Sequence, residues 1–249
     1  MKTQMVDEKM AKRPKKIPTR CAAAVAGNKG GVGKTAFCVN IAFELADRGG
    51  ETWFIDTDYA QKSALKWLMG REKGYKVDHW YKVHENLNAI CVSRKSIVAG
   101  GLSDIAEKWR KGDARFLIFD GRPEPDVSGE IITALLEANM NSTIILPVQL
   151  AADSVDQAES LGMQVKRVAE GKLNCVSFVN MGTSSKISKE LRETLEKMDF
   201  DWIGDLNMSE RIKWAERDCR PLRLVSGAKR TKHYVMIDYI VRGMYRGRV

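Results

Sequence analysis

The feature that most constrains this chain is a glycine-rich loop near its start. Residues 29–35 read Lys-Gly-Gly-Val-Gly-Lys-Thr. The loop follows an apolar run at residues 21–26 and precedes a helical pattern in which Phe37, Ile41 and Leu45 are spaced four apart. A buried strand, a glycine loop and a helix in this order are the context expected of a phosphate-binding loop. The sequence therefore predicts a P-loop. A glycine turn without a ligand is the alternative.

The residue types in this loop suit a nucleoside triphosphate. Backbone N–H groups in a tight glycine turn can all point at a phosphate oxygen, and the following helix adds the positive end of its dipole. Lys34 would reach the β- and γ-phosphates, and the Thr35 hydroxyl would hold Mg²⁺. Where the general pattern has glycine this chain has Asn28, a residue type that tolerates positive φ. Nucleotide contacts are predicted for Asn28, Lys29, Gly30, Gly31, Val32, Gly33, Lys34, Thr35 and Ala36.

Length and composition indicate one α/β domain. The 249 residues are 44% apolar, and single domains of this length are common. Residues 1–19, with Pro14 and Pro18, are predicted to form a basic flexible arm, and residues 20–249 a single domain. No apolar run approaches the ~20 residues of a transmembrane segment, and no secretory signal is evident. The five cysteines lack C-x-x-C spacing, so we expect a reduced, cytoplasmic protein without a zinc or iron–sulfur site.

Basic residues are concentrated at the two ends of the chain. The net charge is +9. Residues 1–20 carry seven Lys and Arg against two acidic residues, and residues 213–249 carry ten against three. Two basic ends on a near-neutral body favour a polyanion partner, with DNA first. For the N-terminal arm alone, a tail that only aids solubility is an equal alternative.

Strand and helix patterns alternate along the chain. Strands are predicted at residues 21–26, 52–55, 87–92, 115–119, 143–147, 174–179 and 202–203, and helices at 34–48, 60–69, 97–111, 129–139, 153–169, 186–198, 208–217 and 228–244. This alternation predicts βαβ units in a mainly parallel sheet with helices on both faces. The basic, aromatic stretch 66–84 is predicted to be a helix end and a loop with packed rings, and nucleic-acid contact is its alternative.

Three aspartates follow predicted strands. Asp56, Asp58 and Asp120 each lie at or just past the carboxyl end of an apolar strand. In a parallel α/β sheet these ends meet at one edge, beside the phosphate loop. Mg²⁺ prefers oxygen ligands, so Asp120 is the natural carboxylate for the metal, directly or through water. A turn former or helix cap is the alternative for any one of them.

The loop also carries a second lysine, five residues before Lys34. The sequence of residues 29–35 resembles the deviant Walker A motif of the ParA/MinD family of P-loop ATPases. In that family the first lysine reaches across a dimer interface to the partner's nucleotide. The resemblance therefore implies an ATP-bound homodimer in which Lys29 of each copy completes the other copy's site, as an arginine finger does elsewhere. A solvated surface lysine is the alternative.

Residues 56–61 resemble the family's switch I motif, D-x-D-P-Q. Tyr59 and Ala60 stand where the motif has proline. The resemblance implies that Asp56 lies close to Mg²⁺ and that Asp58 orients the attacking water. It also places Asp120 as the Walker B carboxylate.

Switch II of the family reads D-x-P-P or similar, and here Arg122 departs from it. Arg122 is open to three roles: pairing with Asp126, contact with a partner subunit, or contact with the nucleotide. Further along, Asn180 follows a strand where the family often places a polar residue on the adenine, and an asparagine turn is its equal alternative. Residues 210–221 resemble the family's closing segment around the base. The resemblance covers roughly residues 20–245.

Members of this family share one ATPase engine and differ in cargo. The resemblance favours a slow, partner-stimulated ATPase that binds DNA non-specifically as an ATP dimer and acts in plasmid or chromosome partition with a ParB-like, centromere-binding adaptor. Lys229, Arg230 and Lys232 are the candidate DNA contacts, and the protein would be associated with the nucleoid. Residues 228–244 are too apolar for a peripheral membrane helix and are expected to pack on the core. The alternative is a MinD-like or other cargo-positioning ATPase that acts at a membrane surface or in conjugation. A small-molecule kinase is less favoured, because the sequence offers no acceptor site.

Overall fold

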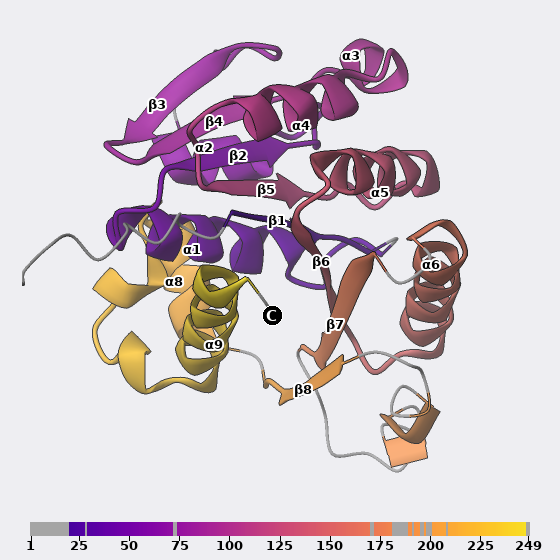
Figure 1. The fold of residues 1–249 in the computed structure, drawn as a ribbon. Coiled ribbons are helices and arrows are strands. Elements are labelled where there is room, and N and C mark those ends of the chain that lie inside the picture. The colour runs from indigo at the N-terminus through magenta and orange to yellow at the C-terminus, as the bar shows by residue number, and fades with distance from the viewer. Residues whose placement is uncertain are drawn as a thin grey trace, which may run out of the picture.

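The computed structural model of the protein describes residues 20–27, 29–71, 74–169, 172–180, 201–207 and 209–247, together with 189–190, 192–194 and 197. The predicted arm 1–19, Asn28 and most of the predicted helix 186–198 lie outside the described residues. What is described forms one sheet with helices on both faces (Figure 1). This confirms the predicted fold class.

The sheet is parallel except at one edge. The strands are β1 Cys21–Val25, β2 Thr52–Asp56, β3 Trp80–His84, β4 Leu87–Cys91, β5 Phe116–Asp120, β6 Asn141–Val148, β7 Leu173–Val179 and β8 Asp201–Asp205. Their order across the sheet is β3-β4-β2-β5-β1-β6-β7-β8, and β3 alone runs antiparallel to its neighbour β4. β1 and β5 are buried along their whole length, as expected of central parallel strands that are covered on both faces.

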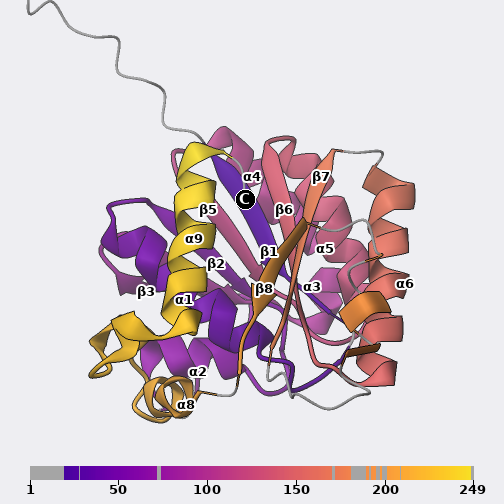
Figure 2. The ribbon, with the colours of Figure 1, turned by 90° about the horizontal axis from the view of Figure 1, so that it is seen from below.

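Helices cover the two faces of the sheet. They are α1 Lys34–Asp47, α2 Ser63–Met69, α3 Arg94–Val98, α4 Gly101–Lys111, α5 Pro125–Ala138, α6 Ala152–Ala169, α8 Glu210–Arg217 and α9 Lys232–Arg246, with short 3₁₀ turns η2 Leu222–Leu224 and η3 Ala228–Arg230. α1, α2, α8 and α9 bury one apolar core against the sheet, and α3, α4, α5 and α6 bury a second. α9 lies along α1 in both views (Figures 1 and 2).

Strand register brings the predicted site residues together. Asp120 is the register partner of Val25 on one side and of Asp56 on the other. β1, β2 and β5 therefore end at the same level, and the glycine loop leaves β1 at that level. The sheet edge that the sequence predicts for the site is the one that the structure forms.

Three local predictions need correction. The stretch 66–84 contains β3, an edge strand that had been expected to be loop, although its rings do pack: Tyr75 and Tyr81 lie 5.5 Å apart between centroids. The single helix predicted at 97–111 is two helices, because Gly100 adopts a left-handed φ of 83° between α3 and α4. The last helix begins at Lys232, where the Thr231 hydroxyl accepts a hydrogen bond from the Tyr234 backbone N–H at 3.2 Å.

Candidate nucleotide site

The glycine loop has a conformation that only glycine fits well. Gly31 and Gly33 have φ of 76° and 91°, values that disfavour other residue types. A Cβ on Gly33 would lie 2.3 Å from the Asn180 side-chain nitrogen. That nitrogen donates to the Val32 carbonyl at 2.9 Å. Asn180, which directly follows β7, thus holds the glycine loop in place. The sequence suggested a contact with adenine or an asparagine turn for this residue and did not predict its hydrogen bond to the loop.

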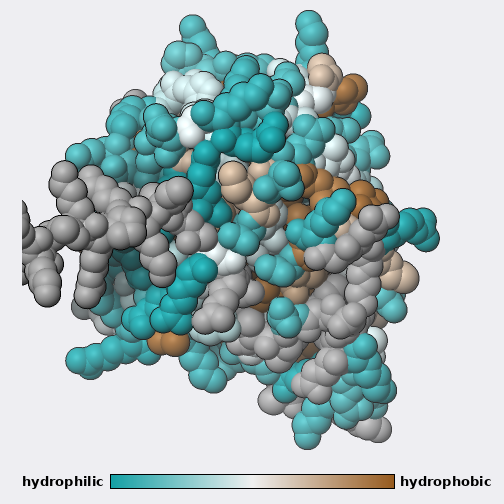
Figure 3. Space-filling view, viewed as in Figure 1, coloured by the Kyte–Doolittle hydropathy of each residue, from teal (hydrophilic) through white to brown (hydrophobic). Residues whose placement is uncertain are grey.

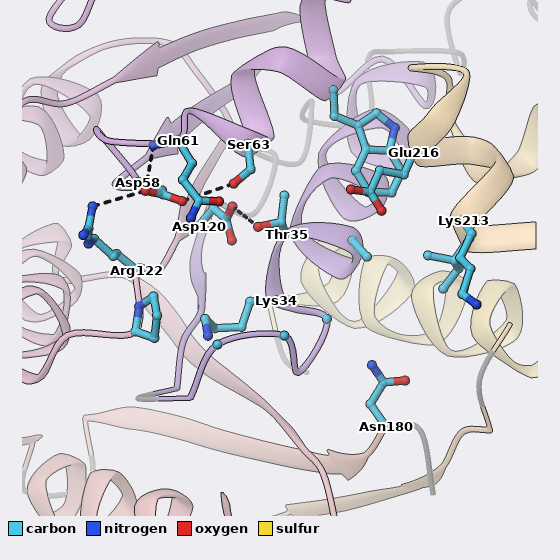
Figure 4. A pocket seen from close by; sticks show the side chains of 18 of the residues that line it. Lys34, Thr35, Asp58, Gln61, Ser63, Asp120, Arg122, Asn180, Lys213 and Glu216 are labelled. Atoms are coloured by element: carbon cyan, nitrogen blue, oxygen red, sulfur yellow. Dashed lines mark hydrogen bonds and ion pairs between the residues drawn. The ribbon is translucent and has the colours of Figure 1, made fainter. Parts of the chain in front are cut away.

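A cavity of about 500 Å³ opens beside the loop at the predicted strand ends (Figure 4). Its lining includes nine residues predicted to act in the site, namely Gly30, Gly31, Gly33, Lys34, Thr35, Ala36, Asp58, Asp120 and Asn180. Lys29, Val32 and Asp56 were also predicted for the site but do not line this cavity. In Figure 4 Asp58 and Asp120 lie at one end of the cavity, and Asn180, Lys213 and Glu216 lie away from them.

Asp120 and Thr35 form the part of the cavity suited to a cation. The Thr35 hydroxyl donates to Asp120 Oδ2 at 2.8 Å. The other oxygen, Oδ1, is buried and has no hydrogen-bond partner among the described residues. Burial, and then the neighbouring Asp56, raise the pKa of Asp120 well above its usual range, and the Thr35 hydrogen bond and the Lys34 charge offset only part of that rise. A hydroxyl and an orphaned carboxylate oxygen fit Mg²⁺, which takes oxygen ligands, so these two residues could hold it.

Lys34 lines the same cavity, and no carboxylate among the described residues forms an ion pair with its ammonium. The ammonium donates to the Lys29 carbonyl, across the loop. Burial lowers the pKa of Lys34 to about 8, and the charges of Asp120 and Asp58 oppose that shift. A buried ammonium is costly without a counter-ion, so the position suits the terminal phosphates of ATP.

Asp56 is oriented differently from Asp120. Its two carboxylate oxygens accept hydrogen bonds from the backbone N–H groups of Asp58 at 2.8 Å and Leu65 at 3.0 Å. It is fully buried, and that burial raises its pKa to about 7. In this structure Asp56 fixes the loop after β2 and the start of α2. Its predicted contact with Mg²⁺ stays a prediction.

The second lysine lies outside the cavity. Lys29 forms an ion pair with Asp153 at the start of α6, and its side chain is 27% exposed. The proximity of Lys29 lowers the pKa of Asp153. Within a single chain the Lys29 ammonium is therefore paired with Asp153, and its predicted action on a second copy stays a prediction.

Arg122 is a site residue whose partner the sequence did not identify. Its Nη1 lies 3.2 Å from Asp58 Oδ1, and its Nε lies 2.5 Å from Glu124 Oε1. Of the three roles that the sequence left open, pairing with Asp126 is not the one that the structure adopts. The family usually has proline at this position, so the arginine was the one sign in the sequence that this residue has a particular role.

The far end of the cavity is built by α8 and by residues that the sequence did not single out. Ile212, Lys213 and Glu216 come from α8, within the segment predicted to close around the base. Trp67 on α2 and His233 on α9 also line the cavity. Trp67 belongs to the stretch 66–84, for which the sequence predicted packed rings and not a nucleotide contact. His233 belongs to no recognisable motif, so the sequence offered no signal for it.

The predicted DNA contacts lie on the surface near the start of α9. Lys229, Arg230 and Lys232 are exposed, and none of the three pairs with an acidic side chain in the described part of the chain. Hydrophilic residues cover most of the described surface on the side of α8 and α9 (Figure 3). These three cations are therefore available to an anionic partner.

Comparison with known proteins decides the family. A model of the CobQ/CobB/MinD/ParA nucleotide binding domain matches residues 23–232. The chain belongs to this family. The match includes the loop, the three strand-end aspartates and Asn180, and it confirms the resemblance to ParA/MinD proteins.

Solved structures agree on the fold. A plasmid partition protein from Borrelia burgdorferi is similar at 18% identity and a TM-score of 0.60, over 81% of this chain and 96% of that one. The septum site-determining protein MinD from Pyrococcus horikoshii, solved with Mg-ADP, is similar at 17% identity and a TM-score of 0.68, over 91% and 98%. Apo McdA from Cyanothece is similar at 16% identity and a TM-score of 0.66, over 92% and 99%. No curated protein matches the sequence.

Proposed function

We propose that this protein is an ATPase of the ParA type, which binds ATP with Mg²⁺, dimerises and then binds DNA non-specifically. The observation that carries the ATPase proposal is the arrangement of Lys34, Thr35 and Asp120 around one cavity, with a buried carboxylate oxygen that lacks a partner. Both the P-loop geometry and membership of a nucleotide-binding family support it.

The reaction proposed is hydrolysis of ATP to ADP and phosphate. A water oxygen attacks the terminal phosphorus, the bond from that phosphorus to the bridging oxygen breaks, ADP leaves with the electron pair of that bond, and one proton of the water is released to solvent. Lys34 would offset the charge on the phosphoryl group, and Asp58, which faces the same end of the cavity, would orient the water. Mg²⁺ held by Thr35 and Asp120 would neutralise phosphate charge. Lys29 of a second copy would add another cation, and Asn180 would contact the adenine.

The DNA proposal rests on charge. Lys229, Arg230 and Lys232 form an exposed basic cluster at η3 and the start of α9. Phosphate contacts of this kind are independent of sequence and sensitive to salt. We propose that the DNA-bound dimer drives plasmid or chromosome partition, and that a ParB-like adaptor stimulates a slow hydrolysis.

The salt dependence of DNA binding tests this proposal. If a dimer contacts six to ten phosphates, its affinity should fall about 10³–10⁵-fold between about 50 and 200 mM salt. Replacing Lys229, Arg230 and Lys232 with alanine should reduce the log–log slope by up to about 3 for each copy bound. The control is the triple alanine variant of Lys108, Arg110 and Lys111, exposed cations on α4 across the sheet, which should leave the slope unchanged. Equal slopes in the two variants would refute the DNA surface.

A membrane-positioning role is the second candidate, because α9 also exposes apolar side chains. Val235 and Tyr239 are 59% and 57% exposed, one helical turn apart. No described helix is both long and apolar enough to cross a membrane, so this role would need a surface-bound helix. Co-sedimentation with DNA and, separately, with anionic liposomes, each with ATP, ADP or no nucleotide, distinguishes the candidates. Partition predicts ATP-dependent pelleting with DNA, and membrane positioning predicts pelleting with liposomes.

A further inference from the structure

Two of the three positions at which this chain departs from its family's switch motifs, Tyr59 and Arg122, meet in space. The guanidinium carbon of Arg122 lies 4.4 Å from the ring centroid of Tyr59, close enough for a cation–π contact. The Tyr59 hydroxyl lies 3.4 Å from Glu124 Oε2. The other Glu124 oxygen accepts from Arg122 Nε at 2.5 Å. Tyr59 and Glu124 thus hold the Arg122 side chain from two sides.

The main chain of Arg122 is held as well. Its backbone N–H donates to the Thr57 hydroxyl at 2.8 Å, and that hydroxyl donates to the Asp120 carbonyl at 2.7 Å. One threonine therefore links the loop after β2 to the loop after β5. The Arg122 side chain starts from a point that is fixed relative to both loops.

What this side chain holds is Asp58. Asp58 Oδ1 accepts from Arg122 Nη1 at 3.2 Å and from the Gln61 backbone N–H at 3.2 Å, while Oδ2 accepts from the Ser63 hydroxyl at 3.4 Å. Figure 4 shows Asp58 between Arg122 and Thr35, at the cavity end that also holds Asp120. Of these partners Arg122 alone is charged, so it makes the strongest of the three contacts.

We propose that Arg122 is a positioning residue for hydrolysis, which holds the Asp58 carboxylate toward the place of the terminal phosphate. The inference rests on the proposed ATPase function. A planar guanidinium can stack on Tyr59 and donate to two carboxylates at once, whereas a lysine ammonium cannot do both. Tyr59 and Arg122 both depart from the family's motifs, and the Tyr59 ring lies where it can stack on the Arg122 guanidinium.

Two other roles for Arg122 make different predictions. A direct contact between Arg122 and the phosphates would make loss of the side chain weaken nucleotide binding. A latch that keeps Asp58 from the water would make loss of the side chain speed hydrolysis. A positioning role predicts slower chemistry with unchanged affinity, because Arg122 then acts only through Asp58.

The test compares Arg122→Ala, Arg122→Lys and Glu124→Ala with wild type. The measurements are kcat for ATP hydrolysis, under saturating DNA, and the Kd for a fluorescent ATP analogue. Arg122→Ala should lower kcat about 10- to 100-fold, the scale expected for a misplaced catalytic group, and should change Kd by less than about twofold. Arg122→Lys should recover little of the rate. Glu124→Ala keeps Arg122 and does not touch Asp58, so it should lower kcat by a smaller factor. If Arg122→Ala does not fold, Glu124→Ala alone still tests whether Arg122 positions Asp58.

The matched control is Arg94→Ala, which removes an exposed arginine of α3 and should keep the wild-type kcat. The inference is overturned if Arg122→Ala and Glu124→Ala both keep or exceed the wild-type kcat. It is also overturned if Kd rises by the same factor as kcat falls, or if Arg122→Lys restores the rate. An inactive wild type would instead refute the proposed function, so the two failures are distinguishable.

Discussion

At the scale of single residues, the site depends on side chains that brace the phosphate loop from outside it. Asn180 donates to the Val32 carbonyl and lies against Gly33, so the loop and β7 are fitted to each other. Asp56 fixes the next loop through two backbone N–H groups. The groups that would touch nucleotide are therefore held in place by the protein's own hydrogen bonds, and donors held in this way are what phosphoryl transfer requires.

Gly33→Ala should destabilise the protein without nucleotide. Gly33 has a φ of 91°, and an added Cβ would meet Asn180 at 2.3 Å. Left-handed backbone with a Cβ costs about 1–2 kcal/mol, and the steric clash adds to that cost. Denaturant unfolding should show a loss of about 1–3 kcal/mol. Gly30→Ala is the control, because no atom lies within 4 Å of its added Cβ. Equal stability of the two variants would count against the loop geometry.

His233 should make stability depend on pH. Burial lowers its pKa from 6.5 to about 4. Between these two pH values His233 is protonated in the unfolded chain and neutral in the folded chain. The free energy of unfolding should therefore fall between about pH 6.5 and 4, by up to about 3 kcal/mol from this residue. His233→Gln should flatten that part of the profile.

The control for this pH effect is His84→Gln, since His84 is exposed on β3. Its profile should follow that of wild type over the same range. If the two variants have profiles of the same shape, His233 does not titrate as a buried group.

At the scale of elements, what the sequence predicts well is what short-range patterns encode. The P-loop and the helix after it were predictable because strand, glycine loop and apolar spacing lie within one short stretch. β3 was not, because it is a half-exposed edge strand with the pattern of an aromatic loop. The pairing of Arg122 with Asp58 joins residues that are 64 apart in the chain, and only the order of the strands brings them together.

α9 is an element whose role the fold constrains directly. Its buried side chains, which include Met236, Ile237, Ile240 and Val241, pack into the core that contains α1, as the sequence predicts. Of the cations proposed for DNA, Lys232 is its first residue, and Lys229 and Arg230 lie in the preceding turn η3. The helix thus completes the core, and its start and the turn before it present the charged surface.

Ile240→Ala should therefore cost about 2–5 kcal/mol of folding stability, the usual range for a fully buried aliphatic side chain. Val235→Ala, on the exposed face of the same helix, should change stability by less than about 0.5 kcal/mol. Denaturant unfolding of both variants checks this. A similar small effect of both would mean that α9 is not part of the core, and would favour a detachable surface helix.

At the scale of the whole molecule, the proposed ATPase needs two copies of the chain. In one chain Lys29 is bound to Asp153 and lies outside the cavity. The family resemblance gives Lys29 a role in the site of a second copy, and that role requires it to leave Asp153. In the proposed function the partner for this step is the nucleotide-bound form of the same protein, so ATP should control assembly.

The most direct measurement is the mass in solution by light scattering, with Mg²⁺ and a non-hydrolysable ATP analogue or ADP. The account predicts a particle of twice the 28.0 kDa of one chain with the analogue and a single chain with ADP. Lys29→Ala should remain single with the analogue while still binding it. Asp153→Asn, which frees Lys29, should dimerise at least as well as wild type. Wild type that stays a single chain with the analogue bound, or Lys29→Ala that dimerises as wild type does, would contradict the central claim.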